Sequence, residues 1–385
     1  MNKPDIRFNG FNEEWTEKKF EDLVDVQSGR DYKHLSEGTI PVYGTGGYML
    51  SVDEALSYNE DAVGIGRKGT IDKPYILKAP FWTVDTLFYS IPKNKMNLDF
   101  IFSAFQTIRW KDKDESTGVP SLSKNAINST EIKIPNESAE QKKLGALFSQ
   151  IDSLIASIQK EHDKLVTLKK CMLQKMFPKK GSLVPEIRFE GFSGDWVEKK
   201  ITDLATIFIG LVTTMTKYYS NQGTLLIRNS DIKDNYFSFS DNPIYLNQEF
   251  ADQNSSRKHK IGDVITVHTG DVGTSAVITE KEEGTIGFAT IVTRPKTNLL
   301  DSMFLSIFLN SDAHKIWAVS VSTGDGRTNY NLGDYTQLLL KIPSLPEQQK
   351  IGSYFQNLDN LISKQSAELE KLKNVKKTLL SKMFV

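Results

Sequence analysis

Three glycines in the segment AVGIGRKGT, Gly64, Gly66 and Gly69, have the spacing of a nucleotide-binding loop. Such a loop binds phosphate because it opens a helix whose N-terminal amide groups face the anion. Here TIDKPYIL follows directly, and Pro74 together with its β-favouring neighbours speaks against a helix. We interpret the three glycines as part of a β-turn and assign them no cofactor.

Residues 242–245 (NPIY) come near to the Asn/Asp-Pro-Pro-aromatic turn with which an amino-methyltransferase holds its target nitrogen, but isoleucine replaces the second proline. The single cysteine, Cys171, permits no intramolecular disulfide and cannot complete a zinc site. No close pair at metal-ligand spacing occurs among the histidines, which are His34, His162, His259, His268 and His314. We therefore expect neither a catalytic centre nor a metal site in this chain.

The most informative feature of the sequence is an internal repeat. The segment PDIRFNGFNEEWTEKKFEDL begins at Pro4, and PEIRFEGFSGDWVEKKITDL begins at Pro185, an offset of 181 (185 − 4). A second pair, EQKKLGALFSQIDSLI from Glu140 and EQQKIGSYFQNLDNLI from Glu347, has an offset of 207 (347 − 140) and stays in register to LQKMF and LSKMF. The segment between the two motifs is therefore 26 residues (207 − 181) longer in the second copy.

Each copy also contains a strand that ends in proline just before a helical pattern begins. The runs EIKIP and LLKIP close at Pro135 and Pro343. Weaker similarities relate GIGRKGT (64–70) to HTGDVGT (268–274) and STG at 116 to STG at 322. The predicted order is domain, helix, domain, helix, with boundaries at 1–138, 139–178, 179–345 and 346–385.

Apolar residues recur every seven positions in both helical segments, which is typical of a coiled coil. The first segment has Leu144, Ile151, Ile158, Leu165 and Met172, with Leu147, Leu154 and Leu168 on the adjacent seam. The second has Ile351, Leu358, Leu372 and Leu379 with Leu361 and Val375, and Gln365 interrupts it. A closed two-fold relation between duplicated halves requires an antiparallel pair, roughly 57 Å long at 1.5 Å per residue. The alternative is a helical hairpin core or an oligomer interface that sets no spacing.

The composition is that of a globular protein with more than one domain. The chain has 385 residues, 39% of them hydrophobic and 25% charged. We find no apolar run of spanning length and no signal peptide at the N-terminus, and so expect a cytoplasmic protein. Lys+Arg and Asp+Glu both number 48, which argues against a strong overall field that attracts nucleic acid. This argument weakens if the charges are segregated or if a partner supplies the phosphate contacts.

Two variable domains, each followed by a long helix that opens with an EQxKIxxxF-type motif, resemble the specificity subunits of type I restriction-modification systems. The resemblance covers nearly the whole chain and depends on EQKKLGALFSQID, EQQKIGSYFQNLD, the IRFxGFxxxW repeat and the KIP strands. It implies an α+β fold with two β-rich target-recognition domains, separated by two long helices that pack as an antiparallel coiled coil with pseudo-two-fold symmetry.

The same resemblance implies a function without catalysis in this chain. Each domain would read one half of a bipartite double-stranded DNA sequence, and the helices would set the spacing and bind two modification (methyltransferase) subunits. DNA methylation with S-adenosylmethionine would then take place on the modification subunits. Two restriction subunits would cleave DNA with ATP and Mg, so no cofactor is expected in this chain.

Side chains that could read bases cluster in loops before the KIP strands, because Arg pairs with guanine, Asn pairs with adenine, and Ser or Thr pairs with either. In the first domain these candidates are Arg67, Lys68, Ser121, Ser123, Lys124 and Asn125. In the second they are Arg327, Thr328, Asn329 and Asn331, with Arg228 and Asn229 as further candidates. We expect Lys68 and Lys124 to hold phosphates. The alternative for each residue is ordinary turn chemistry.

Two other functions stay open from the sequence. The chain could be a coiled-coil scaffold whose domains bind protein and have no DNA specificity. It could also be a self-sufficient adenine methyltransferase, although the missing motifs argue strongly against that.

Overall fold

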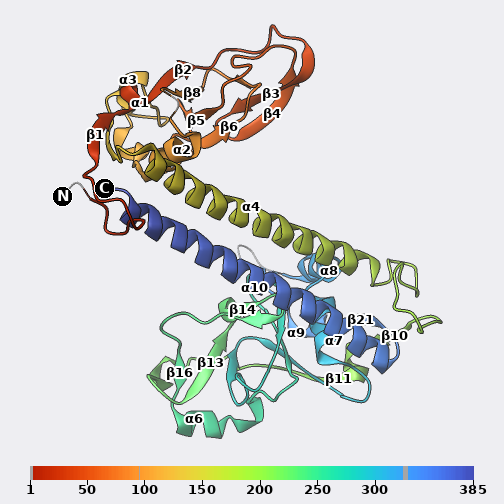
Figure 1. Ribbon diagram of the computed structural model, residues 1–385. Coiled ribbons are helices and arrows are strands. Elements are labelled where there is room, and N and C mark those ends of the chain that lie inside the picture. Colours follow the sequence, from red (N-terminus) through yellow and green to blue (C-terminus); the bar gives the residue numbers. More distant parts are fainter. Residues whose placement is uncertain (1–2, 95, 324–327) are drawn as a thin grey trace. The chain divides into compact units, whose positions relative to one another are not determined.

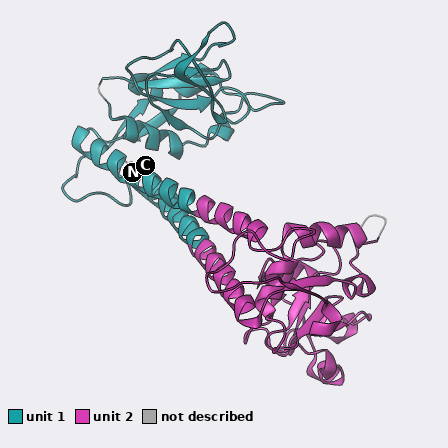
Figure 2. Cartoon of the chain, turned by 90° about the vertical axis from the view of Figure 1, so that its right-hand side faces the viewer, with its two compact units in different colours: residues 1–161, 365–385 teal, residues 162–364 magenta. Residues whose placement is uncertain are grey.

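The computed structural model describes residues 3–94, 96–323 and 328–385, and these form two compact units (Figure 2). Unit 1 comprises residues 1–161 and 365–385, and unit 2 comprises residues 162–364. The two long helices, α4 (Ser138–Lys175) and α10 (Leu345–Met383), each contribute to both units. The predicted α+β class and the two long helices are confirmed, although α4 ends at Lys175, before the expected residue 178.

The described residues of unit 1 form three small sheets (Figure 1). The first sheet pairs β1 (Thr16–Lys19) with β9 (Glu131–Ile134). The second sheet is antiparallel, with the order β2 (Val24–Ser28), β8 (Leu87–Pro92), β5 (Ala62–Gly66) and β6 (Tyr75–Leu77). The third sheet has the order β4 (Gly47–Val52), β3 (Glu37–Gly44) and β7 (Trp82–Thr83). Its shorter helices are α1 (Phe20–Leu23), α2 (Leu98–Thr107) and α3 (Lys124–Asn128). Since Gly64 and Gly66 lie inside β5 and Gly69 adopts φ +87°, the glycine motif forms a strand and a turn and does not open a helix.

Unit 2 repeats this plan with additional strands. The repeated sheets are β10 (Val197–Lys200) with β21 (Leu339–Ile342), and the antiparallel order β11 (Ala205–Ile209), β20 (Ile291–Pro295), β17 (Val264–Thr266), β18 (Ser275–Val277). A third sheet contains β12 (Tyr219–Ser220), β16 (Tyr245–Leu246), β13 (Thr224–Arg228) and β19 (Ile286–Phe288). In it β13 pairs antiparallel with β16 and parallel with β19, as β3 does with β4 and β7 in unit 1. The additional strands are β12 at the edge of this sheet and the antiparallel pair β14 (Ile232–Lys233) and β15 (Tyr236–Phe237). Its shorter helices are α5 (Ile201–Leu204), α6 (Gln248–Gln253), α7 (Ser302–Leu309), α8 (Asp312–Val321) and α9 (Leu332–Tyr335).

The repeated sequence motifs meet in space in both units. Glu140, which is 1% exposed, accepts two hydrogen bonds from the Arg7 guanidinium, at 2.7 and 2.8 Å. The next residue, Gln141, donates to the Pro135 carbonyl at 2.8 Å, and the Lys143 ammonium lies 5.0 Å from the Phe11 ring centroid. The EQxK motif thus ties the start of α4 to both the IRFxGF segment and the KIP strand.

Unit 2 contains the same contacts at the repeated positions. Glu347 accepts from Arg188 at 2.7 and 2.8 Å, and Gln348 donates to the Pro343 carbonyl at 3.0 Å. Lys350 lies 5.7 Å from the ring centroid of Phe192, which corresponds to Phe11 (11 + 181 = 192). Because both copies keep these partners, the two motifs that repeat in the sequence are the two halves of one structural contact.

Each core holds the beginning of one long helix and the end of the other. Unit 1 buries Leu144 and Phe148 of α4 together with Met383 and Phe384 at the end of α10. Unit 2 buries Ile351, Phe355 and Leu358 of α10 together with Met176, just beyond α4. Ion pairs also join the helices, Asp152 with Lys376 in unit 1 and Lys169 with Asp359 in unit 2. Within each unit the helices therefore run antiparallel, which confirms the predicted pairing (Figure 1).

The second seam of the coiled-coil pattern is not covered by the helix pair. Leu154 and Leu361 are 48% and 49% exposed, and Leu168 and Val375 are 37% and 41% exposed. A single partner helix covers only one stripe of an α-helix, so the adjacent apolar stripe stays accessible. Within the described part of the chain, no helix is both long and apolar enough to cross a membrane.

Candidate nucleic-acid interface

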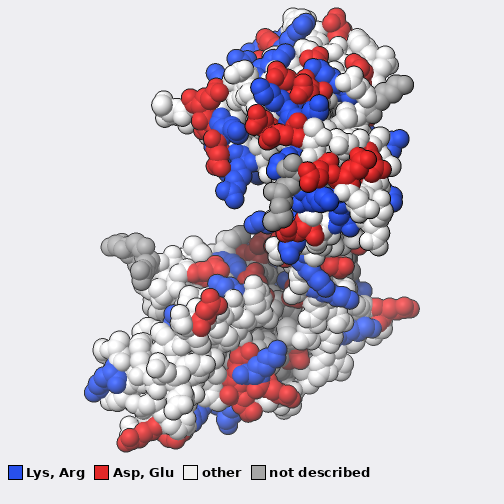
Figure 3. All heavy atoms as spheres, turned by 60° about the vertical axis from the view of Figure 1, so that its left-hand side comes forward, with Lys and Arg blue, Asp and Glu red and all other residues white. Residues whose placement is uncertain are grey.

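Charged side chains are distributed differently over the two units on one face of the molecule (Figure 3). On the face drawn in Figure 3, Lys and Arg alternate with Asp and Glu over unit 1, whereas wide areas of unit 2 carry no charged side chain. This fits the equal numbers of basic and acidic residues. Specific hydrogen bonds to base edges can operate on such a surface, because they depend on placement and not on bulk charge.

The two predicted loops of unit 1 lie side by side. Lys68 forms an antiparallel bridge with Ser121, and the Leu122 amide donates to the Arg67 carbonyl at 2.9 Å. The Gly69 amide donates to the carbonyl of residue 120 at 2.8 Å, which places the β5 turn directly against the segment before α3. Since Arg67 and Lys68 are both exposed, this pairing presents two cations at one edge of the unit.

Several side chains in this pair of loops are engaged within the unit. Ser123 caps α3 by accepting from the Ala126 amide at 2.9 Å, and it donates to Glu115 at 3.1 Å. The Ser121 amide donates to the Asp114 carboxylate at 2.9 Å, and this bond lowers the pKa of Asp114. Lys124 and Asn125, in the first turn of α3, keep exposed side chains.

Unit 2 pairs its corresponding loops in the same way. Asn329 forms an antiparallel bridge with Thr269, and the Tyr330 amide donates to the His268 carbonyl at 2.8 Å. The Asn329 side-chain oxygen accepts from the Thr269 hydroxyl at 2.9 Å, and the Asn331 amide group donates to Thr323 at 3.0 Å. The weak similarities between the two copies therefore mark equivalent loops.

The other candidates of unit 2 differ in their surroundings. The Thr328 carbonyl accepts from the Gly270 amide at 3.2 Å, while Arg327 lies outside the described residues. The Arg228 guanidinium donates two hydrogen bonds to the Asp231 carboxylate, at 2.9 and 3.1 Å. This hydrogen bonding raises the pKa of Arg228. Asn229 accepts from the His268 amide at 2.8 Å and donates to the carbonyl of residue 289 at 3.1 Å. These contacts favour a structural role for Arg228 and Asn229.

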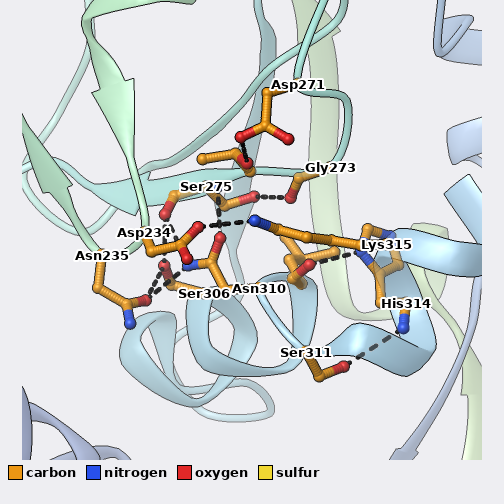
Figure 4. Close-up of polar contacts among 12 residues, drawn as sticks. Asp234, Asn235, Asp271, Gly273, Ser275, Ser306, Asn310, Ser311, His314 and Lys315 are labelled. Carbon is orange, nitrogen blue, oxygen red and sulfur yellow. Dashed lines mark hydrogen bonds and ion pairs between the residues drawn. The ribbon is translucent and has the colours of Figure 1, made fainter. Parts of the chain in front are cut away.

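Half-buried polar groups form a hydrogen-bond network in unit 2 (Figure 4). Asn310, just after α7, accepts from the Ser275 amide at 2.9 Å and donates to Asn235 at 2.8 Å. Asn235 occupies the left-handed region at φ +68° between β14 and β15, a conformation that asparagine tolerates. Its amide also donates to Asp359 of α10 at 3.0 Å, so this turn is fixed to the long helix.

His314 supports the same scaffold in its neutral form. Its ring contacts the Leu309 carbonyl at 2.7 Å and the Tyr330 hydroxyl at 3.3 Å. Burial lowers the pKa of His314 to about 4, so the ring carries no charge near neutral pH. His314 therefore positions Tyr330, the neighbour of Asn329, without adding to the surface charge.

An exposed hairpin in unit 1 was not predicted from the sequence. Tyr48 and Met49, at the start of β4, are 62% and 50% exposed and border a cavity of about 700 Å³ that Tyr32 also lines. The signal in the sequence is GTGGYML, a glycine turn followed by large apolar residues. Such residues can contact the methyl group of thymine in the major groove.

Comparison with protein families shows two matches to the type I restriction modification DNA specificity domain, at residues 12–167 and 193–374. The chain belongs to this family. Both matched ranges begin in the IRFxGF repeat or just beyond it and include much of one long helix, so the family unit consists of a variable domain and its helix.

Two curated members of the family are similar to the chain at low identity. The type I restriction enzyme MjaVIII specificity subunit of Methanocaldococcus jannaschii is 22% identical over 84% of this chain and 75% of its own length. The type I restriction enzyme EcoBI specificity subunit of Escherichia coli is 22% identical over 70% of this chain and 60% of its own length. The chain thus spans less than two thirds of the Escherichia coli relative.

Solved structures share the fold. The crystal structure of a type I restriction-modification system S subunit from M. genitalium matches with a TM-score of 0.69 at 15% identity, covering 100% of this chain and 99% of that one. A chain from a structural study of complex assembly and conformational transition of the type I R-M system matches with a TM-score of 0.52 at 16% identity, covering 96% of this chain and 97% of that one.

Proposed function

We propose that the chain is the DNA-specificity subunit of a type I restriction-modification complex and that each unit reads one half of a bipartite double-stranded DNA sequence. The observation that carries this proposal is the loop pairing that recurs in both units, Lys68 with Ser121 and Thr269 with Asn329. The backbone pairing of the two loops is the same in both units, but the side chains that these loops carry differ. Two equivalent frameworks with different side chains suit the reading of two different half-sites.

The long helices suit two further roles, which are setting the spacing between the half-sites and binding the modification subunits. Leu154 and Val375 lie within two residues of the Asp152–Lys376 ion pair in unit 1. Leu361 and Leu168 occupy the repeated positions beside Asp359–Lys169 in unit 2. Each unit therefore carries two partly exposed apolar side chains of this seam on its helix pair, and we assign one modification subunit to each unit.

In this proposal the partner subunits, and not this chain, catalyse the reactions. The modification subunits bind S-adenosylmethionine and methylate adenine, and two restriction subunits use ATP and Mg. This chain supplies sequence recognition and assembly, and it acts in the cytoplasm, where the host DNA lies. The family membership supports this division of labour.

Mapping of methylated adenines in cells that express the chain with its modification subunit tests the function. We expect one bipartite motif with a fixed spacer that disappears when the gene for this chain is removed. Lys124→Ala should lower methylation at all sites, because a phosphate contact carries no sequence information, whereas Asn125→Ala should relax only one half of the motif. Methylation that is unchanged without this chain would favour the alternative, a coiled-coil scaffold without DNA specificity.

A further inference from the structure

A β-bulge in unit 1 exposes two consecutive apolar side chains near the tip of the β3–β4 hairpin. Tyr43 stands opposite Tyr48 and Val42 stands opposite Leu50, so Met49 is an extra residue in β4. Successive side chains of a regular strand point to opposite faces, and a bulge interrupts this alternation. Tyr48 is 62% exposed and Met49 is 50% exposed, and we call these two residues the tip pair.

The loop between β7 and β8 joins this hairpin to the turn that carries the exposed cations of unit 1. At one end of the loop, the Val84 amide donates to the Tyr43 carbonyl at 3.0 Å. At the other end, the Thr86 carbonyl accepts from the Arg67 amide at 2.8 Å and from the Lys68 amide at 3.3 Å. The hairpin and the two cations therefore flank the same short loop.

The side chain of Met49 lies on the side of the hairpin where this loop runs. A Cβ atom at Gly44 would lie 2.8 Å from the Met49 sulfur and 3.5 Å from a methyl group of Val84, so the glycine leaves room for the thioether. Another exposed apolar side chain, Val119 at 67%, precedes the residue whose carbonyl accepts from the Gly69 amide. Apolar side chains thus border the cations on the surface that the paired loops form.

The chemistry of a base edge indicates what such an apolar pair can contact. This inference rests on the proposed function, in which unit 1 reads a DNA half-site. Most groups that base pairs present in the major groove are hydrogen-bond donors and acceptors, and thymine adds a methyl group. We propose that the tip pair contacts the 5-methyl group of a thymine in the half-site of unit 1, which makes Tyr48 and Met49 specificity-determining residues. The half-site contains at least one thymine, because the proposed target of methylation is adenine.

The described residues of unit 2 build the equivalent connection differently. The strands that correspond to β3 and β4 are β13 and β16, and residues 229–244 join them. In this connection Asn229 accepts from the His268 amide at 2.8 Å, and Asn235 donates to Asp359 of α10 at 3.0 Å. The connection is therefore held by polar contacts within unit 2, and we assign the thymine contact to the half-site of unit 1 alone.

Replacement of thymine by uracil tests the proposal, because uracil forms the same base pair and lacks only the methyl group. The affinity of the chain assembled with its modification subunits is measured for duplexes in which each thymine of the mapped motif is replaced in turn. In the wild type, replacement of at least one thymine in one half-site should weaken binding about fourfold, the effect of one methyl group withdrawn from an apolar contact. In the double variant Tyr48→Ser, Met49→Gln, the same replacement should change the affinity less than about 1.5-fold.

Tyr58→Ser is the matched control for the tip pair. Tyr58 is 58% exposed in the same unit, and it follows Ser57, which pairs with Phe81 just before β7. The loop that joins the hairpin to the cations follows β7, so Tyr58 lies near the other end of this strand. This control should keep the full sensitivity of the wild type to uracil.

Three results would overturn the inference. The first is a wild-type complex that binds thymine and uracil duplexes equally at every position. The second is a double variant that keeps the sensitivity of the wild type to uracil. The third is a double variant that binds both kinds of duplex more weakly by the same factor, which would indicate a phosphate contact or a wedge in the minor groove, away from the methyl group.

Failure of the proposed function is a separate outcome of the same work. If no bipartite motif depends on this chain, the proposed function falls and the thymine contact falls with it. If the motif is present but shows no coupling between uracil and the tip pair, only the thymine contact is wrong. Circular dichroism checks that the variants fold, and the single variants Tyr48→Ser and Met49→Gln replace the double variant if it does not.

Discussion

The EQxK motif illustrates how single residues hold each domain to its helix. Glu140 is buried, and the Arg7 guanidinium satisfies both of its oxygens. An intact buried ion pair contributes only modestly to the stability of the fold. Removal of one partner is strongly destabilising, because the other charge is then left without a counter-ion in a poorly solvated position. The contact therefore accounts for the presence of both motifs in both copies.

Glu140→Gln should destabilise unit 1 by about 3 kcal/mol, because Arg7 keeps its charge and loses its counter-ion. Hydrogen exchange followed by mass spectrometry measures this effect, with faster exchange expected in residues 3–94. Glu347→Gln is the matched variant and should loosen unit 2 around Arg188 instead. Equal loosening of both units by either variant would contradict the assignment of each ion pair to its own unit.

The candidate DNA-reading residues separate into two groups at this scale. Ser123, Asn329 and Arg228 use their polar atoms in hydrogen bonds within their own units. Arg67, Lys68, Lys124 and Asn125 keep exposed side chains and are the better candidates for contact with DNA. Serine and asparagine serve turns and base recognition with the same atoms, so only their actual partners distinguish the two roles.

The two apolar seams of the long helices differ in their exposure to solvent. One seam is buried or half-buried in each unit, for example at Ile158 and Leu358. The other seam, represented by Leu154 and Leu361, is about half exposed in both copies. An apolar seam that recurs at equivalent positions and stays accessible supports the proposed binding of a partner protein to the helix pair.

Leu154→Lys and Leu361→Lys should each remove one modification subunit from the complex and change the stability of the isolated chain by less than about 0.5 kcal/mol. Native mass spectrometry of the complex reports the number of bound subunits. Ser157→Lys is the control, because Lys364 already stands at the equivalent position of the second copy (157 + 207 = 364). If both leucine variants keep two modification subunits, the exposed seam is not the binding site.

On the scale of the whole molecule, the end of each long helix completes the core of the domain that opens with the IRFxGF motif. Phe177, just after α4, lies 6.0 Å from Trp196 between ring centroids, and Phe384, just after α10, lies 5.9 Å from Trp15. Phe384 also contacts Phe100 and Phe148. The two ends of the chain therefore belong to one unit.

Phe384→Ala should destabilise unit 1 by about 3–5 kcal/mol, since it removes a buried aromatic ring and leaves a cavity. Urea unfolding monitored by hydrogen exchange should show the loss in residues 3–94, far away in the sequence. Phe177→Ala is the counterpart that should affect unit 2 first. A Phe384→Ala chain with unchanged protection in residues 3–94 would show that the C-terminal ring does not support this core.

The sequence by itself determined the duplication, the α+β class, the two long helices and their antiparallel pairing. These features rest on periodicity and on repeated motifs, which are local patterns that a reader can follow along the chain. The KIP strands were also predictable, because proline stops an alternating run just before a helix starts. Sequence similarity between the two copies also indicated which loops correspond, but its register was wrong by three residues: it aligned Gly64 with His268 (268 − 64 = 204), whereas the bridges pair Lys68 and Thr269 with their partners (269 − 68 = 201).

Only the tertiary structure decided which atoms of those loops stay available and what the repeated motifs contact. The partner of Glu140 lies 133 positions away, and the partner of Asn329 lies 60 positions away. Hydrogen-bond partners and cavities arise from distant segments brought together in the fold, and therefore no local pattern of residues encodes them.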